Sequence, residues 1–244
     1  MIAKLFLKSV ARAAGFEVRR VSPVKKEMAP LSIPDAELYQ PYYSPWRSPA
    51  FAAEFARIAP YTLVSDDRCY LLASLVTQAA QLPGEVWECG VYQGGTAMLL
   101  ASRISATGRT LRLFDTFEGM PETDPIRDLH KAGEFRETSI EAVQSRVMGD
   151  HVHFHKGLIP GTFRGLEQTR IAFAHVDVDI YGSIRACCEF IFPRLCVGGF
   201  MVIDDYGAPS CPGTRAAIDE FFQGQPSIPL ALPTEQAIVF KSLS

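Results

Sequence analysis

Hydrophobic positions along this chain alternate between the spacing of strands and the spacing of helices. Short apolar runs of strand length predict strands over residues 85–89, 110–114, 152–156, 171–176, 200–203 and 237–241. Apolar residues at helical spacing predict helices over residues 50–58, 66–81, 96–104, 139–148, 182–192 and 214–222. Because most strands are followed by a helix, we expect an α/β fold built around a mainly parallel sheet.

Composition limits the classes of protein that fit this pattern. With 244 residues, 48% of them hydrophobic, the chain can bury a large core. We expect one α/β domain over residues 50–244 and an N-terminal extension over residues 1–49. A net charge of -3 gives no electrostatic reason to expect a nucleic acid partner. The six cysteines fall in predicted core elements without Cys-x-x-Cys spacing, which indicates neither disulfides nor a zinc site and favours the cytoplasm.

The N-terminal extension has its own pattern. Lys4, Lys8 and Arg12 recur at helical spacing among apolar residues, so residues 1–16 predict a helix with a cationic stripe. This helix is too short and charged to span a bilayer. Residues 1–26 could contact an anionic inner membrane surface, or the helix could dock on its own domain or on another subunit of a homo-oligomer. Repeated prolines make residues 22–48 an irregular connector.

A glycine-rich turn follows the first predicted strand, in the run Val86-Trp87-Glu88-Cys89-Gly90-Val91-Tyr92-Gln93-Gly94-Gly95-Thr96. Gly90 permits a tight turn, and Gly94 and Gly95 would let a ligand approach the backbone. The helix that begins near Thr96 would point unpaired N–H groups at that ligand. Glu88 favours a ligand that carries positive charge. The spacing is neither a dinucleotide motif nor a P-loop, and a purely structural strand-to-helix turn is the alternative.

Acidic residues stand at the ends of four predicted strands: Glu88, Asp115, Asp177 with Asp179, and Asp204 with Asp205. Ligands of open α/β sheets bind beyond the carboxyl ends of the strands, where Asp115 is placed to accept hydrogen bonds from ribose hydroxyls. The crowded later aspartates predict a hard divalent cation such as Mg²⁺, which would relieve their repulsion. Solvated acids that cap turns and helices are the alternative for each group.

Residues 118–137 form a polar stretch with little periodicity, which is long for a connecting loop. Such loops are often lids or binding loops. His130 lies in this stretch and could help as a base, although an ordinary loop residue is the simpler interpretation. His175 stands in the middle of a predicted strand, where a packed core residue is expected.

The chain resembles the macrocin O-methyltransferase family, whose members methylate sugar hydroxyls with S-adenosylmethionine and a metal ion. The resemblance extends from about residue 61 to residue 222. It rests on four motifs in order: Glu88-Cys-Gly90-Val-Tyr-Gln-Gly94-Gly95-Thr96, Phe114-Asp115-Thr-Phe-Glu-Gly119-Met-Pro121, His175-Val-Asp177-Val-Asp179-Ile-Tyr181 and Gly198-Gly199-Phe-Met-Val-Ile-Asp204-Asp205-Tyr206. It implies a class I methyltransferase fold, which is Rossmann-like and doubly wound, with a mostly parallel seven-stranded sheet and a reversed final strand.

The resemblance also implies roles for individual residues. Asp115 would hold the ribose of the cofactor, while its amino-acid part would contact Glu88, Gly90, Tyr92, Gln93, Gly94 and Thr96. Mg²⁺ would be bound by Asp177, Asp204 and Asp205. Asp177 would also be the general base, and Asp179 competes for the place of first metal ligand because it lies two residues further along the same strand face.

The sequence thus predicts a Mg²⁺-assisted O-methyltransferase that uses S-adenosylmethionine on a hydroxyl of a sugar, a glycan or a glycosylated natural product. The cationic N-terminus favours a glycan near a membrane. A metal-dependent hydrolase and a non-catalytic binding protein with a methyltransferase-like fold are the alternatives. Intact metal-binding acids argue against the second of these, because a binding module has no need of them.

Overall fold

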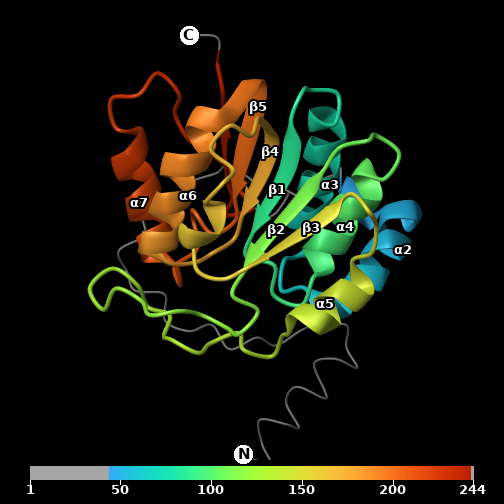
Figure 1. The fold of residues 1–244 in the computed structure, drawn as a ribbon, viewed down its shortest axis with the longest axis horizontal. Helices are drawn as coiled ribbons and strands as arrows, with labels where there is room; N and C mark the ends of the chain where they lie inside the picture. The colour runs from blue at the N-terminus through green and yellow to red at the C-terminus, as the bar shows by residue number, and fades with distance from the viewer. Residues whose placement is uncertain (1–43, 243–244) are drawn as a thin grey trace, which may run out of the picture. The chain divides into compact units, whose positions relative to one another are not determined.

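Seven strands form one sheet in the order β3-β2-β1-β4-β5-β7-β6 (Figure 1). The computed structural model describes residues 44–242. Strands β1 to β5 are parallel, and β7 and β6 run antiparallel to their neighbours. The strands are β1 (Glu85–Cys89), β2 (Leu111–Asp115), β3 (Val152–Lys156), β4 (Ile171–Val176), β5 (Leu195–Ile203), β6 (Leu230–Ala231) and β7 (Ala237–Phe240). The mostly parallel seven-stranded sheet with a reversed strand confirms the predicted architecture.

Helices cover both faces of this sheet (Figure 1). The α-helices are α2 (Pro49–Ile58), α3 (Asp66–Ala79), α4 (Gly95–Ile104), α5 (Ile140–Arg146), α6 (Tyr181–Arg194) and α7 (Pro212–Phe222). Short 3-10 turns are η1 (Pro45–Arg47), η2 (Ala59–Tyr61) and η3 (Gly161–Phe163). All six helices predicted after residue 49 are present, with ends that differ by a few residues. Among the described residues, no helix is long and apolar enough to cross a membrane.

Alternation along the strands divides the core into two layers. Val86 packs with side chains of α3 and α4, whereas its neighbour Trp87 packs with side chains of α6 and α7. Phe173 and Ala174 of β4 divide between the same two layers. Because successive side chains of a strand point to opposite faces, an uninterrupted apolar run is what a strand covered on both faces requires.

Strand β5 begins five residues before its predicted start at Phe200. The prediction was wrong because Gly198 and Gly199 suggested a turn. In the structure they belong to an irregular stretch of the strand, between the pairs Leu195–Ile171 and Phe200–Phe173. A Cβ at Gly199 would lie 2.9 Å from the carbonyl oxygens of both Ala172 and Cys196, so glycine lets this bulge lie close to β4.

The predicted N-terminal helix, its membrane or subunit contact and most of the connector lie outside the described residues. Strand β6 was not predicted, because two exposed residues carry no periodic pattern.

Replacement of Trp87 tests the layer formed with α6. Its ring is fully buried, lies 4.6 Å from the ring of Phe114 between centroids, and also contacts Phe163 and Phe190. We expect Trp87→Ala to lower the free energy of unfolding by about 3–5 kcal/mol, since it leaves a large cavity. Chemical denaturation measures this, with Ile228→Ala, which removes an exposed side chain, as the control. A loss of less than about 1 kcal/mol would contradict the packing described.

Candidate active site

Backbone hydrogen bonds join the carboxyl ends of four neighbouring strands. The Gly90 N–H donates to the Phe114 carbonyl at 2.9 Å, and the Asp177 N–H donates to the Cys89 carbonyl at 2.8 Å. The Asp204 N–H donates to the Val176 carbonyl at 3.0 Å. These bonds continue the sheet beyond the last residues of β2, β1, β4 and β5. They place the predicted glycine turn beside the predicted acids, where the strand order reverses between β1 and β4.

No residue with a side chain fits at position 90 in this conformation. The φ of Gly90 is +85°, and a Cβ there would lie 1.7 Å from the carbonyl oxygen of Asp177. Any side chain would therefore force the turn away from the segment that follows β4.

One cavity of about 270 Å³ opens at these strand ends. The turn after β1, the end of β2, the segment after β4, the loop after β5 and residues 116–138 all contribute to it. The residues used below that line it are Leu63, Arg68, Gly90, Tyr92, Thr96, Asp115, Met120, His130, Phe135, Leu158, Asp177, Asp179, Asp204, Asp205 and Cys211. Both halves of the predicted site therefore face the same space.

Asp115 holds the glycine turn in place. Its Oδ2 accepts the N–H groups of Val91 at 2.6 Å and Tyr92 at 3.0 Å, and its Oδ1 accepts the N–H of Phe117 at 2.7 Å. Tyr92 has a φ of +50°, which is uncommon for a residue with a side chain. One carboxylate thus fixes both the turn after β1 and the start of the long loop after β2.

The predicted cofactor residues fall into two groups. Gly90, Tyr92, Thr96 and Asp115 line the cavity, whereas Glu88, Gln93 and Gly94 are not among its lining residues. The space in front of Gly94 is filled by Val143, since a Cβ at Gly94 would lie 2.9 Å from its Cγ1.

Gly95 likewise faces protein, since a Cβ there would lie 2.7 Å from the Cβ of Thr62. Contacts within the protein therefore account for glycine at both positions, without a ligand. These two glycines let α4 pack closely against α5 and against the segment before α3.

A row of buried charged side chains lies on the face of the sheet that α3 covers. His175 is fully buried, as expected for a strand residue, and its Nδ1 lies 3.0 Å from Glu88 Oε1. Its Nε2 lies 3.5 Å from Asp204 Oδ1, which also accepts a 2.7 Å hydrogen bond from Gln236. The guanidinium of Arg68 donates to Asp204 Oδ2 at 2.5 Å. Both oxygens of Asp204 are therefore engaged.

In this row of buried side chains, each acid lies beside a basic group. Burial would lower the pKa of His175, but the carboxylates of Asp204 and Glu88 outweigh it and raise the pKa to about 10. Burial would raise the pKa of Asp204, but His175 and Arg68 hold it below its ordinary value. Only Glu88 Oε2 among these carboxylate oxygens is buried without a hydrogen-bond partner in the described part of the chain.

Three further aspartates adjoin these groups, since Asp177 also lies within 4.8 Å of ligand atoms of His175 and Asp204, and Asp205 Oδ1 lies 3.4 Å from Arg68 Nη1. Asp177, Asp179 and Asp205 each offer a carboxylate oxygen within 4.8 Å of the others. Burial and the charges of Asp204 and Asp205 raise the pKa of Asp177 well above its ordinary value. Burial and Asp205 raise the pKa of Asp179 to about 7. Such repulsion is what a divalent cation would relieve, and an oxygen-only donor set fits Mg²⁺.

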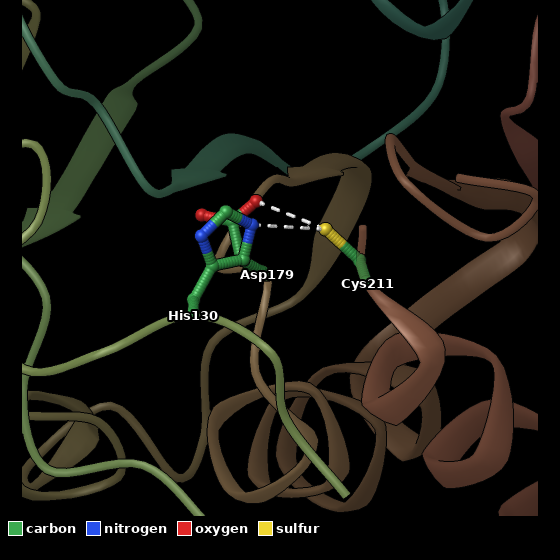
Figure 2. A group of neighbouring side chains, drawn as sticks. All are labelled: His130, Asp179 and Cys211. Carbon is green, nitrogen blue, oxygen red and sulfur yellow. Dashed lines mark hydrogen bonds between the residues drawn. The ribbon is translucent and has the colours of Figure 1, made fainter. Parts of the chain in front are cut away.

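The long loop after β2 reaches across the cavity to α6 and α7. Asp128 Oδ1 accepts the Tyr181 N–H at 2.9 Å, which fixes the loop at the start of α6. His130 lies with its Nε2 3.5 Å from Cys211 Sγ, and that sulfur lies 3.7 Å from Asp179 Oδ1 (Figure 2). Burial raises the pKa of the Cys211 thiol, so it is neutral in this arrangement.

The cavity residues Arg68 and Cys211, which carry a charge and a metal-binding atom, were not assigned to the site from the sequence. Arg68 lies on α3 and gives no local signal, because an arginine on a helix is ordinarily a solvated residue. Cys211 is buried, as predicted, but it also lines the cavity, next to the first residue of α7.

A family model described as macrocin-O-methyltransferase (TylF) matches residues 50–232. The chain belongs to the macrocin-O-methyltransferase family. The 8-demethyl-8-(2,3-dimethoxy-alpha-L-rhamnosyl)-tetracenomycin-C 4'-O-methyltransferase of Streptomyces olivaceus is 32% identical to this chain over 155 residues. The match covers 57% of this chain and 58% of that protein. Mycinamicin III 3''-O-methyltransferase of Micromonospora griseorubida is 30% identical over 180 residues, which cover 66% of this chain and 70% of that protein.

Solved structures show the fold that this family member shares. The O-methyltransferase NovP superposes with a TM-score of 0.67 and 22% identity, over 75% of this chain and 83% of that one. A calicheamicin methyltransferase superposes with a TM-score of 0.61 and 19% identity, over 79% of this chain and 93% of that one. The fold is that of the class I methyltransferases, as the sequence predicted.

Replacing Gly90 tests the contact that joins the two halves of the site. We expect Gly90→Ala to be destabilising because its Cβ would collide with the Asp177 carbonyl. Gly108→Ala is the matched control, since Gly108 has a φ of +68° but no atom within 4 Å of an added Cβ. It should cost only the strain of about 1–2 kcal/mol.

Denaturant unfolding measures both variants. The loss for Gly90→Ala should exceed that of the control by at least about 2 kcal/mol, and failure to fold beside a folded control counts as the same result. Equal losses would show that the turn can move away from β4 freely.

Proposed function

We propose that this protein transfers the methyl group of S-adenosylmethionine to a hydroxyl oxygen of a sugar carried by a small molecule, with Mg²⁺ as the metal. The observation that carries the proposal is the shared cavity, in which the turn after β1 and Asp115 face the aspartates that follow β4 and β5. Methyl transfer is an in-line displacement, so a donor and an acceptor held side by side are its main requirement.

The donor half has features that suit a cationic cofactor. Gly90, Tyr92, Thr96 and Asp115 line its side of the cavity. Glu88 Oε2 is buried without a partner, as expected of a carboxylate whose hydrogen-bond donor is absent. In one neighbour of the same fold, an O-methyltransferase from Bacillus cereus with a TM-score of 0.53, the bound ligand is S-adenosylhomocysteine. We propose that Glu88 and the turn hold the amino-acid part of the donor and Asp115 its ribose.

On the acceptor side, Asp177, Asp204 and Asp205 are the proposed ligands of Mg²⁺. Asp179 belongs to the same oxygen cluster as Asp177 and Asp205 and competes for the place of first ligand. Asp204 and Asp205 both pair with Arg68, at 2.5 and 3.4 Å, so they would bind a metal ion only if this guanidinium moved or shared the carboxylates. When bound, Mg²⁺ lowers the pKa of the acceptor hydroxyl and fixes its position.

Proton removal falls to an aspartate that faces the cavity. We propose Asp177 as the general base that takes the proton of the acceptor hydroxyl as the methyl group transfers. Asp179 is the alternative, because it lines the same cavity two residues further along the chain.

Apolar side chains border the cavity and suit a glycoside with a hydrophobic aglycone. Leu63 and Leu158 line it while 66% and 60% exposed, and Met120 and Phe135 add further apolar surface from the long loop. Exposed apolar side chains gathered at a cavity are typical of binding surfaces. One relative is named for a rhamnosyl derivative of tetracenomycin-C, which supports a sugar-bearing acceptor here.

Replacing Asp205 separates the two halves of the proposed site. We expect Asp205→Asn to lower kcat for methyl transfer by at least about a hundredfold, because it weakens cation binding and activation of the acceptor. Binding of S-adenosylhomocysteine, measured by calorimetry, should change by less than about threefold because the donor half is untouched. Methyl transfer is followed by mass spectrometry of a panel of glycosylated natural products.

The control is Asp150→Asn, an exposed aspartate in the turn before β3, which should leave both measurements unchanged. Full turnover by Asp205→Asn, or by the wild type in EDTA, would remove the metal from the mechanism. No thermal stabilisation by S-adenosylhomocysteine, together with stabilisation by phosphate and metal, would favour a hydrolase.

A further inference from the structure

His130, Asp179 and Cys211 bring three different metal-binding atoms together at one side of the cavity (Figure 2). They come from the loop after β2, the segment after β4 and the residue before α7, so no sequence spacing connects them. The three ligand atoms lie within 4.8 Å of one another. A set with nitrogen, oxygen and thiol sulfur differs in kind from the oxygen-only cluster of Asp177, Asp179 and Asp205, and it suits a softer cation.

We propose that this group is a second metal site, which takes a divalent cation of borderline softness such as Zn²⁺ and ties the loop after β2 to the start of α7. Zinc binds sulfur at about 2.3 Å and nitrogen or oxygen at about 2.0–2.1 Å, so the ligand atoms of a tetrahedral site with one sulfur lie roughly 3.3–3.6 Å apart. The measured separations from Cys211 Sγ are 3.5 Å to His130 Nε2 and 3.7 Å to Asp179 Oδ1.

The imidazole of His130 is oriented for this role by a neighbour. Its Nδ1 lies 2.6 Å from Glu134 Oε2, which leaves Nε2 directed at Cys211. Histidines that bind metals commonly hydrogen-bond a carboxylate through the other ring nitrogen.

The main chain of Asp179 is also held in place by a hydrogen bond. The Thr214 hydroxyl donates to the Asp179 carbonyl at 2.9 Å, while Asp179 has the uncommon φ of +57°. This link fixes the segment after β4 against α7.

The three ligands also define what the site would do. All of them line the cavity, so a fourth coordination position is open to water or to an acceptor oxygen. A cation there would fasten the loop across the cavity and would draw Asp179 away from the neighbouring acids. Binding of a softer metal ion at this site would therefore control access to the cavity.

Cobalt is the probe for this site, because Co²⁺ replaces Zn²⁺ and its bond to a thiolate absorbs in the near ultraviolet. We expect the metal-free full chain to develop this absorption with one equivalent of Co²⁺ and to lose it when Zn²⁺ is added. Cys211→Ala should abolish the band, and Cys188→Ala, which removes a buried thiol of α6, should retain it. Mg²⁺ should not produce it.

Two loop variants make the test independent of core packing. His130→Gln should weaken Zn²⁺ binding by at least about a hundredfold and Glu134→Gln by about tenfold to a hundredfold. His153→Gln, at an exposed position of β3, should have no effect. Trypsin cleavage after the exposed Lys131 should slow when Zn²⁺ binds to the wild type but not to His130→Gln.

A wild type without the thiolate band, a band that survives Cys211→Ala, or Zn²⁺ affinity unchanged by His130→Gln would each overturn the proposal. None of these outcomes depends on methyl transfer, because the readouts are metal binding and loop cleavage. Failure of the second metal site is therefore distinguishable from failure of the proposed function, which is measured by turnover and S-adenosylhomocysteine binding.

Discussion

The site depends on the close approach of the main chain at Gly90 to the main chain at Asp177. The hydrogen bond from the Asp177 N–H to the Cys89 carbonyl continues the pairing of β1 with β4 beyond the ends of both strands. No side chain fits between these segments, because an added Cβ would lie 1.7 Å from the Asp177 carbonyl oxygen. The distance between the two halves of the cavity is consequently set by the sheet and not by mobile side chains, which is the arrangement that precise alignment requires.

The acidic residues of the site differ in their cationic neighbours. Arg68 and His175 accompany Asp204 and Glu88 in the row of buried side chains, so these two acids have cationic neighbours. Asp177, Asp179 and Asp205 stand beside them, and burial together with the neighbouring carboxylates raises the pKa values of Asp177 and Asp179. Arg68 also reaches Asp205 at 3.4 Å, so Asp177 and Asp179 are the two of these three aspartates without an ion pair to an arginine or lysine among the described residues. A divalent cation would relieve the remaining repulsion.

Local patterns in the sequence predicted most of the fold and the end of the sheet at which the cavity opens. The apolar runs of β1 and β4, and the acids that follow them, can be recognised from consecutive residues. The parallel topology then brings the ends of these strands together. Local patterns did not predict contacts between distant segments. Arg68 meets Asp204 across 136 positions, and His130 meets Cys211 across 81. The packing of Gly94 against Val143 and of Gly95 against Thr62 was not predicted for the same reason.

A crystal structure of the full chain with S-adenosylhomocysteine and Mn²⁺, with anomalous scattering used to locate the metal, tests the central claim most directly. Mn²⁺ occupies oxygen-ligand sites in place of Mg²⁺ and can be located without reference to the protein coordinates. The account predicts an anomalous peak in contact with Asp177 and Asp205, with the cofactor against Gly90 and Asp115 in the same cavity. A cofactor bound there with no peak at these aspartates, or a peak with the cofactor elsewhere, would contradict it.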